Sequence, residues 1–245
     1  MKAEFSEFQF SISVLGELKK GLRFGRAKNR SFYSPTPYEE HSLGYDIEIK
    51  AAVPIFLQFK RPCYLRRTNA KYYKNRKFEV PYYLFELNTR VASKSRSRIS
   101  NGLNISQHNT LISLAHQGNH VYYCSAKFHS IGDFDQFYVK DEICENSVFI
   151  KTNNLPKYPN NTSHVIVYNQ YGKFKPFSQG NLELDEPTSF DDFIEELQHA
   201  DRKSSQEVVR DLNEAFHTDL SDLSWGAIQK ELIRRGIYML LLVDL

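Results

Sequence analysis

The spacing of apolar residues changes several times along the chain, and this order of patterns limits the possible folds more than any other feature. Over residues 6–20 apolar side chains recur at helical spacing, and Ser6 with Gln9 has the form of a capping box. The middle of the chain holds short runs that alternate in polarity or are apolar throughout, as strands do. From Ser189 onward the helical spacing returns. This order of helix, strands, helix, strands and helical tail predicts an α/β fold.

The positions of the individual elements follow from the same patterns. Strands are predicted over residues 44–50, 55–60, 82–87, 121–125, 148–151 and 165–169. The first two of these strands are predicted to pair as a hairpin centred near Ala52. Helices are predicted over residues 106–117, 189–199, 205–217 and 223–235. The composition of residues 179–189 is that of a linker, so we divide the chain into a core (residues 1–178) and a helical C-terminal subdomain (residues 179–245).

Composition and cysteine usage exclude several classes of protein. The 245 residues, of which 41% are hydrophobic, suffice for a folded domain with a sizeable core. The three cysteines include no C-x-x-C pair, which argues against a zinc ribbon or a redox motif. The N-terminal segment lacks the apolar block of a signal peptide, and residues 238–243 are too few to span a bilayer. We therefore expect a cytoplasmic protein with no membrane partner.

Basic residues are concentrated in the first half of the chain. Residues 1–110 hold 20 Lys and Arg against 9 Asp and Glu, whereas residues 111–245 hold 12 against 20. A one-sided positive field attracts a polyanion, and nucleic acid is the commonest such partner. A solvated surface on which charges happen to cluster is the alternative explanation.

The segment GYDIEIKAAVPIFLQFKRP contains the candidate catalytic residues. Side chains alternate along a strand, so Gln58 and Lys60 should share one face of theirs. In the predicted hairpin Asp46 lies across from Gln58, with about 5 Å between the two Cβ atoms. One carboxylate, one amide oxygen and one ammonium group would then converge on a single patch.

These groups suit metal-assisted hydrolysis of a phosphodiester. Mg²⁺ prefers hard oxygen ligands, which Asp46 and Gln58 would provide, and Mn²⁺ could replace it. The metal would polarise the phosphate and activate a water, while Lys60 would orient that water or offset negative charge in the transition state. A further metal ligand is expected from the first helix. Glu17 is preferred because the end of a helix disfavours an uncompensated anion, and Glu7 is the second choice.

The pattern of Asp46, eleven residues, and then Gln58-Phe59-Lys60 resembles the D…(E/Q)xK motif of the PD-(D/E)XK nuclease superfamily. It is most similar to the Mrr-type restriction endonucleases, in which Gln also replaces the usual Glu. The resemblance covers residues 5–62 by motif and residues 63–125 by the order of elements. It implies a restriction-endonuclease-like core, with a mixed central sheet flanked by helices. It also implies a Mg²⁺-dependent endonuclease that acts on DNA in restriction, phage defence or repair.

A basic, tyrosine-rich stretch follows directly after Lys60. Because Lys and Arg pair with phosphates and tyrosines stack on bases, we predict nucleic-acid contacts by Arg61, Arg66, Arg67, Lys71, Lys74, Arg76 and Lys77. Gln107 and His108 open a helix after its predicted N-cap, Ser106, and could contact phosphate at that helix terminus. A flexible basic loop and a capped surface helix are the respective alternatives.

Two other functions are compatible with the sequence. A nucleic-acid-binding module with a degenerate metal site would use the basic residues 61–98 without cleavage, since Gln58 weakens the charge pairing with a metal. A partner-dependent effector would dock a sensor or a second copy through the helical tail, residues 189–245. In that case the apolar run Tyr238–Val243 is a docking element, unless it forms a buried C-terminal strand.

Overall fold

The computed structural model describes residues 1–21, 30–33, 52–66, 81–87, 106–158, 164–171, 173–177 and 188–244. Its helices are α1 (Glu7–Gly21), α3 (Gln107–His116), α4 (Ile131–Lys140), the short η3 (Thr152–Asn154), α5 (Phe190–His199), α6 (Ser205–Phe216) and α7 (Trp225–Arg234). Its strands are β1 (Arg30–Tyr33), β2 (Val53–Lys60), β3 (Cys63–Leu65), β4 (Tyr82–Leu87), β5 (His120–Ala126), β6 (Ser147–Lys151), β7 (His164–Tyr168), β8 (Phe174–Phe177) and β9 (Tyr238–Asp244). None of the described helices is long and apolar enough to cross a membrane.

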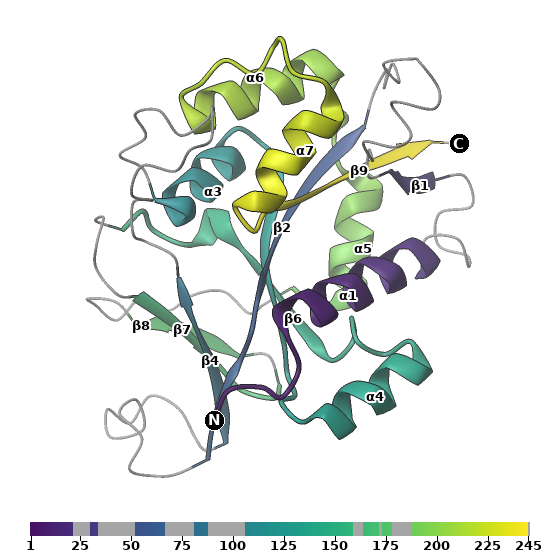
Figure 1. Ribbon diagram of the computed structural model, residues 1–245, viewed down its shortest axis with the longest axis vertical. Coiled ribbons are helices and arrows are strands. Elements are labelled where there is room, and N and C mark those ends of the chain that lie inside the picture. The colour runs from purple at the N-terminus through teal and green to yellow at the C-terminus, as the bar shows by residue number, and fades with distance from the viewer. Residues whose placement is uncertain are drawn as a thin grey trace.

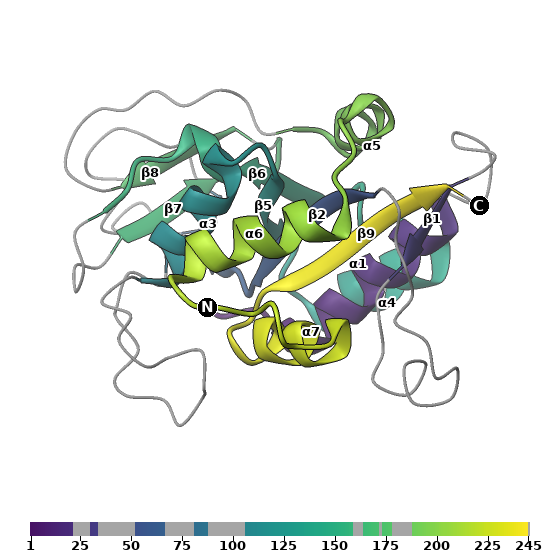
Figure 2. The ribbon, with the colours of Figure 1, turned by 90° about the horizontal axis from the view of Figure 1, so that it is seen from above.

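The strands form two sheets (Figures 1 and 2). The larger sheet has the order β1-β9-β2-β5-β6 and the smaller has the order β3-β4-β7-β8. In the larger sheet β2 runs parallel to β5, and the other pairings are antiparallel. Parallel neighbours need a crossover connection, and the chain between β2 and β5 passes through β3, β4 and α3. The predicted α/β class and the mixed sheet are thus confirmed.

Strand β2 lies at the centre of the larger sheet, and its residues VPIFLQF are all buried. A run of apolar residues is expected for a strand that is covered on both faces. Leu57 and Phe59 belong to one core cluster, whereas Phe56 belongs to the other. Gln58 and Lys60 therefore share the face of Phe56, which confirms the predicted alternation.

Each face of the larger sheet packs against its own set of elements (Figure 1). One face is covered by α1, α4 and α5, through side chains that include Phe10, Phe134 and Phe193. The opposite face is covered by α3, α6, α7 and the smaller sheet, through side chains that include Leu111 and Leu212. The larger sheet is therefore the middle layer of the molecule.

Helix starts follow the capping residues of the sequence. The Ser6 backbone N–H donates to Gln9 Oε1 (2.9 Å), and the Gln9 N–H donates to Ser6 Oγ (3.0 Å). These reciprocal bonds are a capping box. At α3 the Ser106 hydroxyl accepts from the Asn109 N–H (3.3 Å). Both predicted helix starts are confirmed.

Helix α4 is not among the predicted elements. It begins after Ser130, whose hydroxyl accepts a hydrogen bond from the Asp133 N–H (3.0 Å). Phe134 is the only one of its residues that is buried. Its apolar residues Ile131, Phe134 and Tyr138 recur at helical spacing, so this spacing and the Ser130 cap are the signals that could have found it.

The predicted hairpin partner of β2 is wrong over the middle of that strand. From Ile55 to Leu57, β2 pairs with β5 on one edge and with β9 on the other. No edge is left there for a strand from residues 44–50. Those residues, Asp46 among them, lie outside the described residues.

The C-terminal part of the chain shares the core of the rest. The three predicted helices are present as α5, α6 and α7, and the run after them forms β9 between β1 and β2. Gly236, with a φ of 69°, turns the chain from α7 into β9. The interpretation of Tyr238–Val243 as a docking element is therefore wrong, and the alternative of a buried strand is confirmed. Division at residue 178 into a core and a helical subdomain does not describe how these elements pack.

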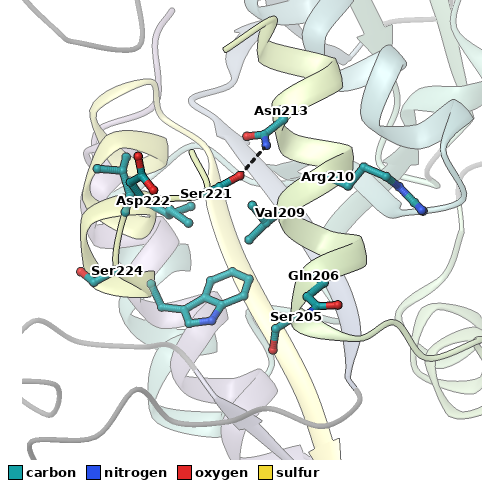
Figure 3. A pocket seen from close by; sticks show the side chains of 11 residues that line it. Ser205, Gln206, Val209, Arg210, Asn213, Ser221, Asp222 and Ser224 are labelled. Carbon is teal, nitrogen blue, oxygen red and sulfur yellow. Dashed lines mark hydrogen bonds between the residues drawn. The ribbon is translucent and has the colours of Figure 1, made fainter. Parts of the chain in front are cut away.

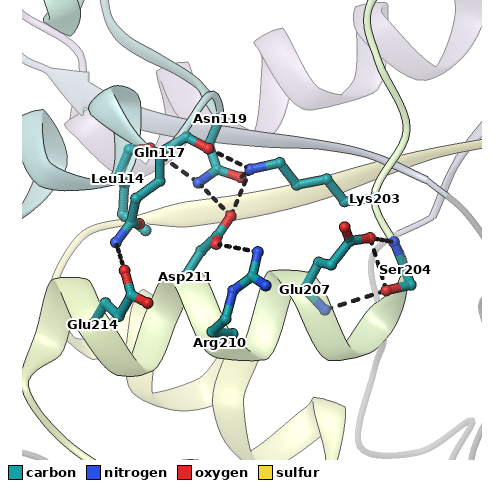
Figure 4. A network of polar contacts seen from close by, with 9 residues as sticks. All are labelled: Leu114, Gln117, Asn119, Lys203, Ser204, Glu207, Arg210, Asp211 and Glu214. Carbon is teal, nitrogen blue, oxygen red and sulfur yellow. Dashed lines mark hydrogen bonds and ion pairs between the residues drawn. The ribbon is translucent and has the colours of Figure 1, made fainter.

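A buried polar network fixes the connection between α5 and α6 (Figure 4). Lys203 Nζ donates to Asp211 Oδ2 (2.5 Å), to the Gln117 carbonyl (2.7 Å) and to Asn119 Oδ1 (3.1 Å). Asn119 Nδ2 also donates to Asp211 Oδ2 (3.1 Å). The Lys203 backbone exchanges two hydrogen bonds with Ala52 (2.9 and 2.8 Å). The network is therefore attached to the start of β2.

Candidate functional site

Gln58 and Lys60 lie near the C-terminal end of β2, on the face that is covered by α3 and the smaller sheet. The Gln58 side chain is 3% exposed, and its Oε1 has no hydrogen-bond partner among the described residues. Buried polar atoms without a partner are rare, and each one suggests a water, an ion or a functional role. Gln58 Oε1 is thus an available neutral oxygen ligand.

The Lys60 ammonium group lies in a partly desolvated position. Burial lowers the pKa of Lys60 to about 8, against the attraction of Glu7 and Glu86. Its Nζ lies 5.7 Å from the centroid of the Tyr123 ring, within the range of a cation–π contact. A charge that is held away from water acts more strongly on a nearby anion than an exposed charge does.

Glu7, at the start of α1, is the acid of that helix that interacts with Lys60. The residue is exposed as a whole, but its carboxyl lies over the chain at Arg61 and accepts a hydrogen bond from that backbone. Desolvation raises the pKa of the Glu7 carboxyl, although Lys60 and the Arg61 backbone act in the opposite direction. The opposite charges of Glu7 and Lys60 therefore attract each other where both are partly removed from water.

Glu17, the preferred metal ligand of the sequence prediction, has a different environment. Its carboxylate oxygens accept the backbone N–H groups of Ile143 (2.8 Å) and Cys144 (2.7 Å). Desolvation raises the pKa of Glu17, and these two hydrogen bonds lower it. Glu17 thus ties α1 to the turn after α4, and the structure brings Glu7 rather than Glu17 to Lys60.

Strand β5 supports the site from the neighbouring position. Tyr123 lies across from Gln58, and Ser125 lies across from Lys60. The Ser125 hydroxyl donates to the Lys60 carbonyl (2.9 Å) and contacts the hydroxyl of Tyr168 (2.8 Å). These contacts fix the backbone at the end of β2, so the two site side chains start from a rigid base.

His108 lies behind Tyr123 and is fully buried. Its Nε2 is 3.0 Å from the Pro156 carbonyl, which can only accept, so Nε2 carries the proton. Nδ1 then accepts from the Tyr123 hydroxyl (2.8 Å). Burial lowers the pKa of His108 to about 4, so the ring is neutral. The His108 ring is therefore not available to a phosphate, whereas the contact expected at the N-terminus of this helix stays a prediction.

Of the other predicted nucleic-acid contacts, only three fall within the described residues. Gln107 donates its amide to the Arg235 carbonyl and joins the start of α3 to the end of α7. Arg61 is exposed, but its guanidinium donates to the Ala3 carbonyl (3.0 Å from Nε). Arg66 is exposed. The remaining basic residues of the prediction lie outside the described residues: Arg67, Lys71, Lys74, Arg76 and Lys77.

Sequence reasoning missed several residues of this site. Glu86 is the only charged residue of the strand YYLFEL, and a lone charge in an apolar strand was the signal for it. Tyr123, Ser125 and Tyr168 gave no signal, because their proximity to Lys60 depends on which strands pair. Within the described residues no group of three or more His, Cys, Asp and Glu side chains could hold a metal ion. The predicted metal set also needs Asp46.

Two cavities lie elsewhere. An open cleft of about 810 Å³ between α6 and α7 is lined by apolar side chains, including Trp225 and Val209, and by a polar rim (Figure 3). A smaller cavity of about 170 Å³ lies at the start of β5 and is lined in part by Glu196. Burial would raise the pKa of Glu196, but hydrogen bonds from His120 and Lys151 lower it to about 2. Neither cavity contains Gln58 or Lys60.

No protein-family model, curated protein or solved structure matches this chain.

Proposed function

We propose that this protein is a metal-dependent nuclease that hydrolyses phosphodiester bonds of nucleic acid, with DNA as the substrate and Mg²⁺ or Mn²⁺ as the metal. The observation that carries the proposal is the buried Gln58 oxygen, which has no partner among the described residues and lies on the same strand face as Lys60. Leaving such an oxygen unsatisfied is costly, and a hard divalent cation is a ligand that would satisfy it.

Each residue would have a distinct role. Asp46 and Gln58 would hold the metal, which when bound would supply Lewis-acid polarisation of the scissile phosphate. The Lys60 ammonium would stabilise the negative charge that develops on the phosphate oxygens. Glu7 attracts that ammonium and would keep it charged and oriented.

The order of elements also supports the proposal. Helix α1 carries Glu7, β2 carries Gln58 and Lys60, and α3 leads into β5, which is parallel to β2. The PD-(D/E)XK superfamily, which the motif resembles, has this order of acidic helix, motif strand, second helix and further strand. A restriction-endonuclease-like fold is therefore part of the proposal. Its biological setting, restriction or phage defence, follows from the resemblance alone.

The direct test is cleavage by the purified full chain. Plasmid, linear duplex and single-stranded DNA are incubated with and without Mg²⁺ or Mn²⁺, and the products are separated by electrophoresis. We expect metal-dependent cleavage by the wild type and a loss of roughly 100-fold or more in Lys60→Ala and Asp46→Ala. Lys173→Ala, which removes an exposed lysine from the turn between β7 and β8, is the matched control and should cut like the wild type. Cleavage by Lys60→Ala at the wild-type rate would remove the proposal.

Gln58→Glu separates a nuclease from a binding module with a degenerate site. In an active enzyme the added charge strengthens the pairing with the metal, so the preference between Mg²⁺ and Mn²⁺ should change. In a binding module the same variant should leave DNA affinity unaltered and produce no cleavage. The full metal series with both proteins distinguishes the two outcomes.

A further inference from the structure

An aromatic column connects the candidate site to the surface. Tyr168, which contacts Ser125 across from Lys60, stacks with Tyr83 at 5.5 Å between ring centroids. Tyr83 contacts Tyr64 (5.2 Å), and Tyr64 stacks on His129 at 3.9 Å with 17° between the planes. The column therefore begins at Tyr168, which contacts the strand beside Lys60. It ends at a stacked pair, Tyr64 and His129.

The exposure of these rings increases along the column. Tyr168 is 0% exposed and Tyr83 is 7% exposed, whereas Tyr64 and His129 are both partly exposed. The inner rings are core residues that fix the position of the outer pair. Tyr64 lies on β3, at the edge of the smaller sheet, four residues after Lys60. The outer pair is thus a rigid aromatic surface next to the end of β2.

The surroundings of the outer pair suit a charged, planar ligand. Arg66 follows Tyr64 by two residues and is exposed, and the Tyr64 backbone is held by hydrogen bonds to Met1 (2.7 and 2.8 Å). The Glu4 N–H donates to the His129 carbonyl (2.8 Å), so the N-terminal segment positions both rings. Rigid rings beside an arginine are the usual means of binding a base and its phosphate together.

We infer that Tyr64 and His129 form a stacking platform for an unpaired nucleotide next to the scissile phosphate. This inference rests on the proposed nuclease function and names its substrate as DNA with an unpaired base. A base within a duplex is covered by its neighbours on both faces. Stacking on a protein ring therefore requires a single strand or a nucleotide that has left the helix.

The test measures DNA affinity in the non-cleaving Lys60→Ala background, by fluorescence anisotropy without metal. Three labelled probes are used: a single-stranded oligonucleotide, the matched duplex, and the duplex with one bulged nucleotide. We expect Tyr64→Leu to weaken single-strand binding by roughly 5- to 150-fold, as expected for the loss of one base–aromatic stack. Duplex binding should change less than twofold. Affinity of the bulged duplex should fall as for the single strand if the protein also accepts an extruded base.

Two controls keep the result interpretable. Tyr171→Leu removes an exposed tyrosine that lies outside the column and should leave all three affinities unchanged. His129→Leu removes the second ring of the outer pair, and this residue lies outside β3. The variant should reproduce the selective loss if Tyr64→Leu does not fold. Equal losses on the single strand and the duplex, or no loss on either, would overturn the inference.

The outcomes for the inference and for the nuclease function are distinguishable. If the wild-type protein cleaves no DNA but binds single strands in a Tyr64-dependent way, the stacking inference is supported and the nuclease function is rejected. If the protein cleaves duplex DNA in a metal-dependent way and neither Tyr64→Leu nor His129→Leu changes the rate, the nuclease function is supported and the stacking inference is rejected.

Discussion

Lys60 places a positive charge at the partly buried end of a central strand. On the same face, the Gln58 side-chain oxygen has no hydrogen-bond partner among the described residues. Neither group suits a strand that is optimised for stability alone, because burial of a charge and of an unpaired polar atom both cost free energy. Single residues that oppose stability are typical of functional sites.

The first prediction concerns the cost of Lys60. Lys60→Met should raise the free energy of unfolding at pH 7 by about 1–3 kcal/mol, because the variant buries no charge.

The pH dependence of stability gives a second measure of the same cost. Since the folded pKa of Lys60, about 8, is below the ordinary value of 10.5, the unfolded chain binds more protons between these pH values. Wild-type stability should therefore rise from pH 8 to 10.5, and Lys60→Met should lack this rise. Urea unfolding at several pH values measures both effects. Lys173→Met is the control, and an equal gain there would contradict the assignment.

The second prediction concerns His108. Its folded pKa of about 4 is below the ordinary 6.5, so the unfolded state binds more protons in this window. Wild-type stability should fall as the pH is lowered from 6.5 to 4, by an amount on the order of 3 kcal/mol. His108→Gln can still donate to Pro156 and accept from Tyr123, but does not titrate. Its denaturant midpoint should fall less over this window, and parallel pH profiles for the two proteins would refute the role of this ring.

At the level of elements, local signals in the sequence identify segments but do not choose their neighbours. The continuous apolar run of β2, the alternating strand β4 and the Ser106 cap of α3 all appear where the sequence predicts them. The predicted hairpin does not fit the middle of β2, because β5 and β9 take both edges of that strand from Ile55 to Leu57. A strand forms hydrogen bonds with any complementary edge, and the best partner can be far away in the chain. Helix α4 was not predicted, although its apolar residues recur at helical spacing and Ser130 caps its start.

The same limit applies to the candidate site. Gln58 and Lys60 could be predicted as a pair because they lie two residues apart on one strand. The interaction of Glu7 with Lys60, and the position of Tyr168 beside Ser125, depend on contacts between distant segments. Glu17 illustrates the error this causes. Its position on the helix suggested a metal ligand, while its partners are two backbone amides from the turn after α4.

The third prediction concerns the network that joins α6 to α3 (Figure 4). The Lys203 and Asp211 side chains are 16% and 5% exposed. Asp211→Ala should lower the free energy of unfolding by about 3–5 kcal/mol, because it leaves the Lys203 charge unpaired. The double variant Lys203→Met with Asp211→Leu should recover most of this loss. Thermal unfolding checks both, with exposed Asp222→Ala as the control; a double variant that is no more stable than Asp211→Ala would contradict the explanation.

The whole molecule depends on its C-terminal part. Helices α6 and α7 cover one face of the larger sheet, α5 covers the other, and β9 fills the position between β1 and β2. Both core clusters therefore combine residues of the C-terminal part with residues from the rest of the chain. The predicted boundary at residue 178 therefore does not coincide with a boundary between the two core clusters.

The fourth prediction follows from that packing. A chain that ends at residue 186 should not fold cooperatively, because it exposes one edge of β2 and uncovers part of each face of the sheet. Circular dichroism should show no sigmoidal thermal transition, and limited proteolysis should degrade the chain completely. The wild-type chain under the same conditions is the reference. A protease-resistant fragment with a cooperative transition would show that the remaining segment folds alone.

The position of β9 also has a consequence for synthesis. A ribosome makes the chain from its N-terminus, so β2 leaves the exit tunnel long before the strand that covers its second edge. Until residues 238–244 have been translated, the nascent chain presents an open apolar strand, which is a substrate for chaperones. The sheet around β2 can therefore be completed only after residues 238–244 have been made, so synthesis of β2 and completion of its surroundings are separated in time.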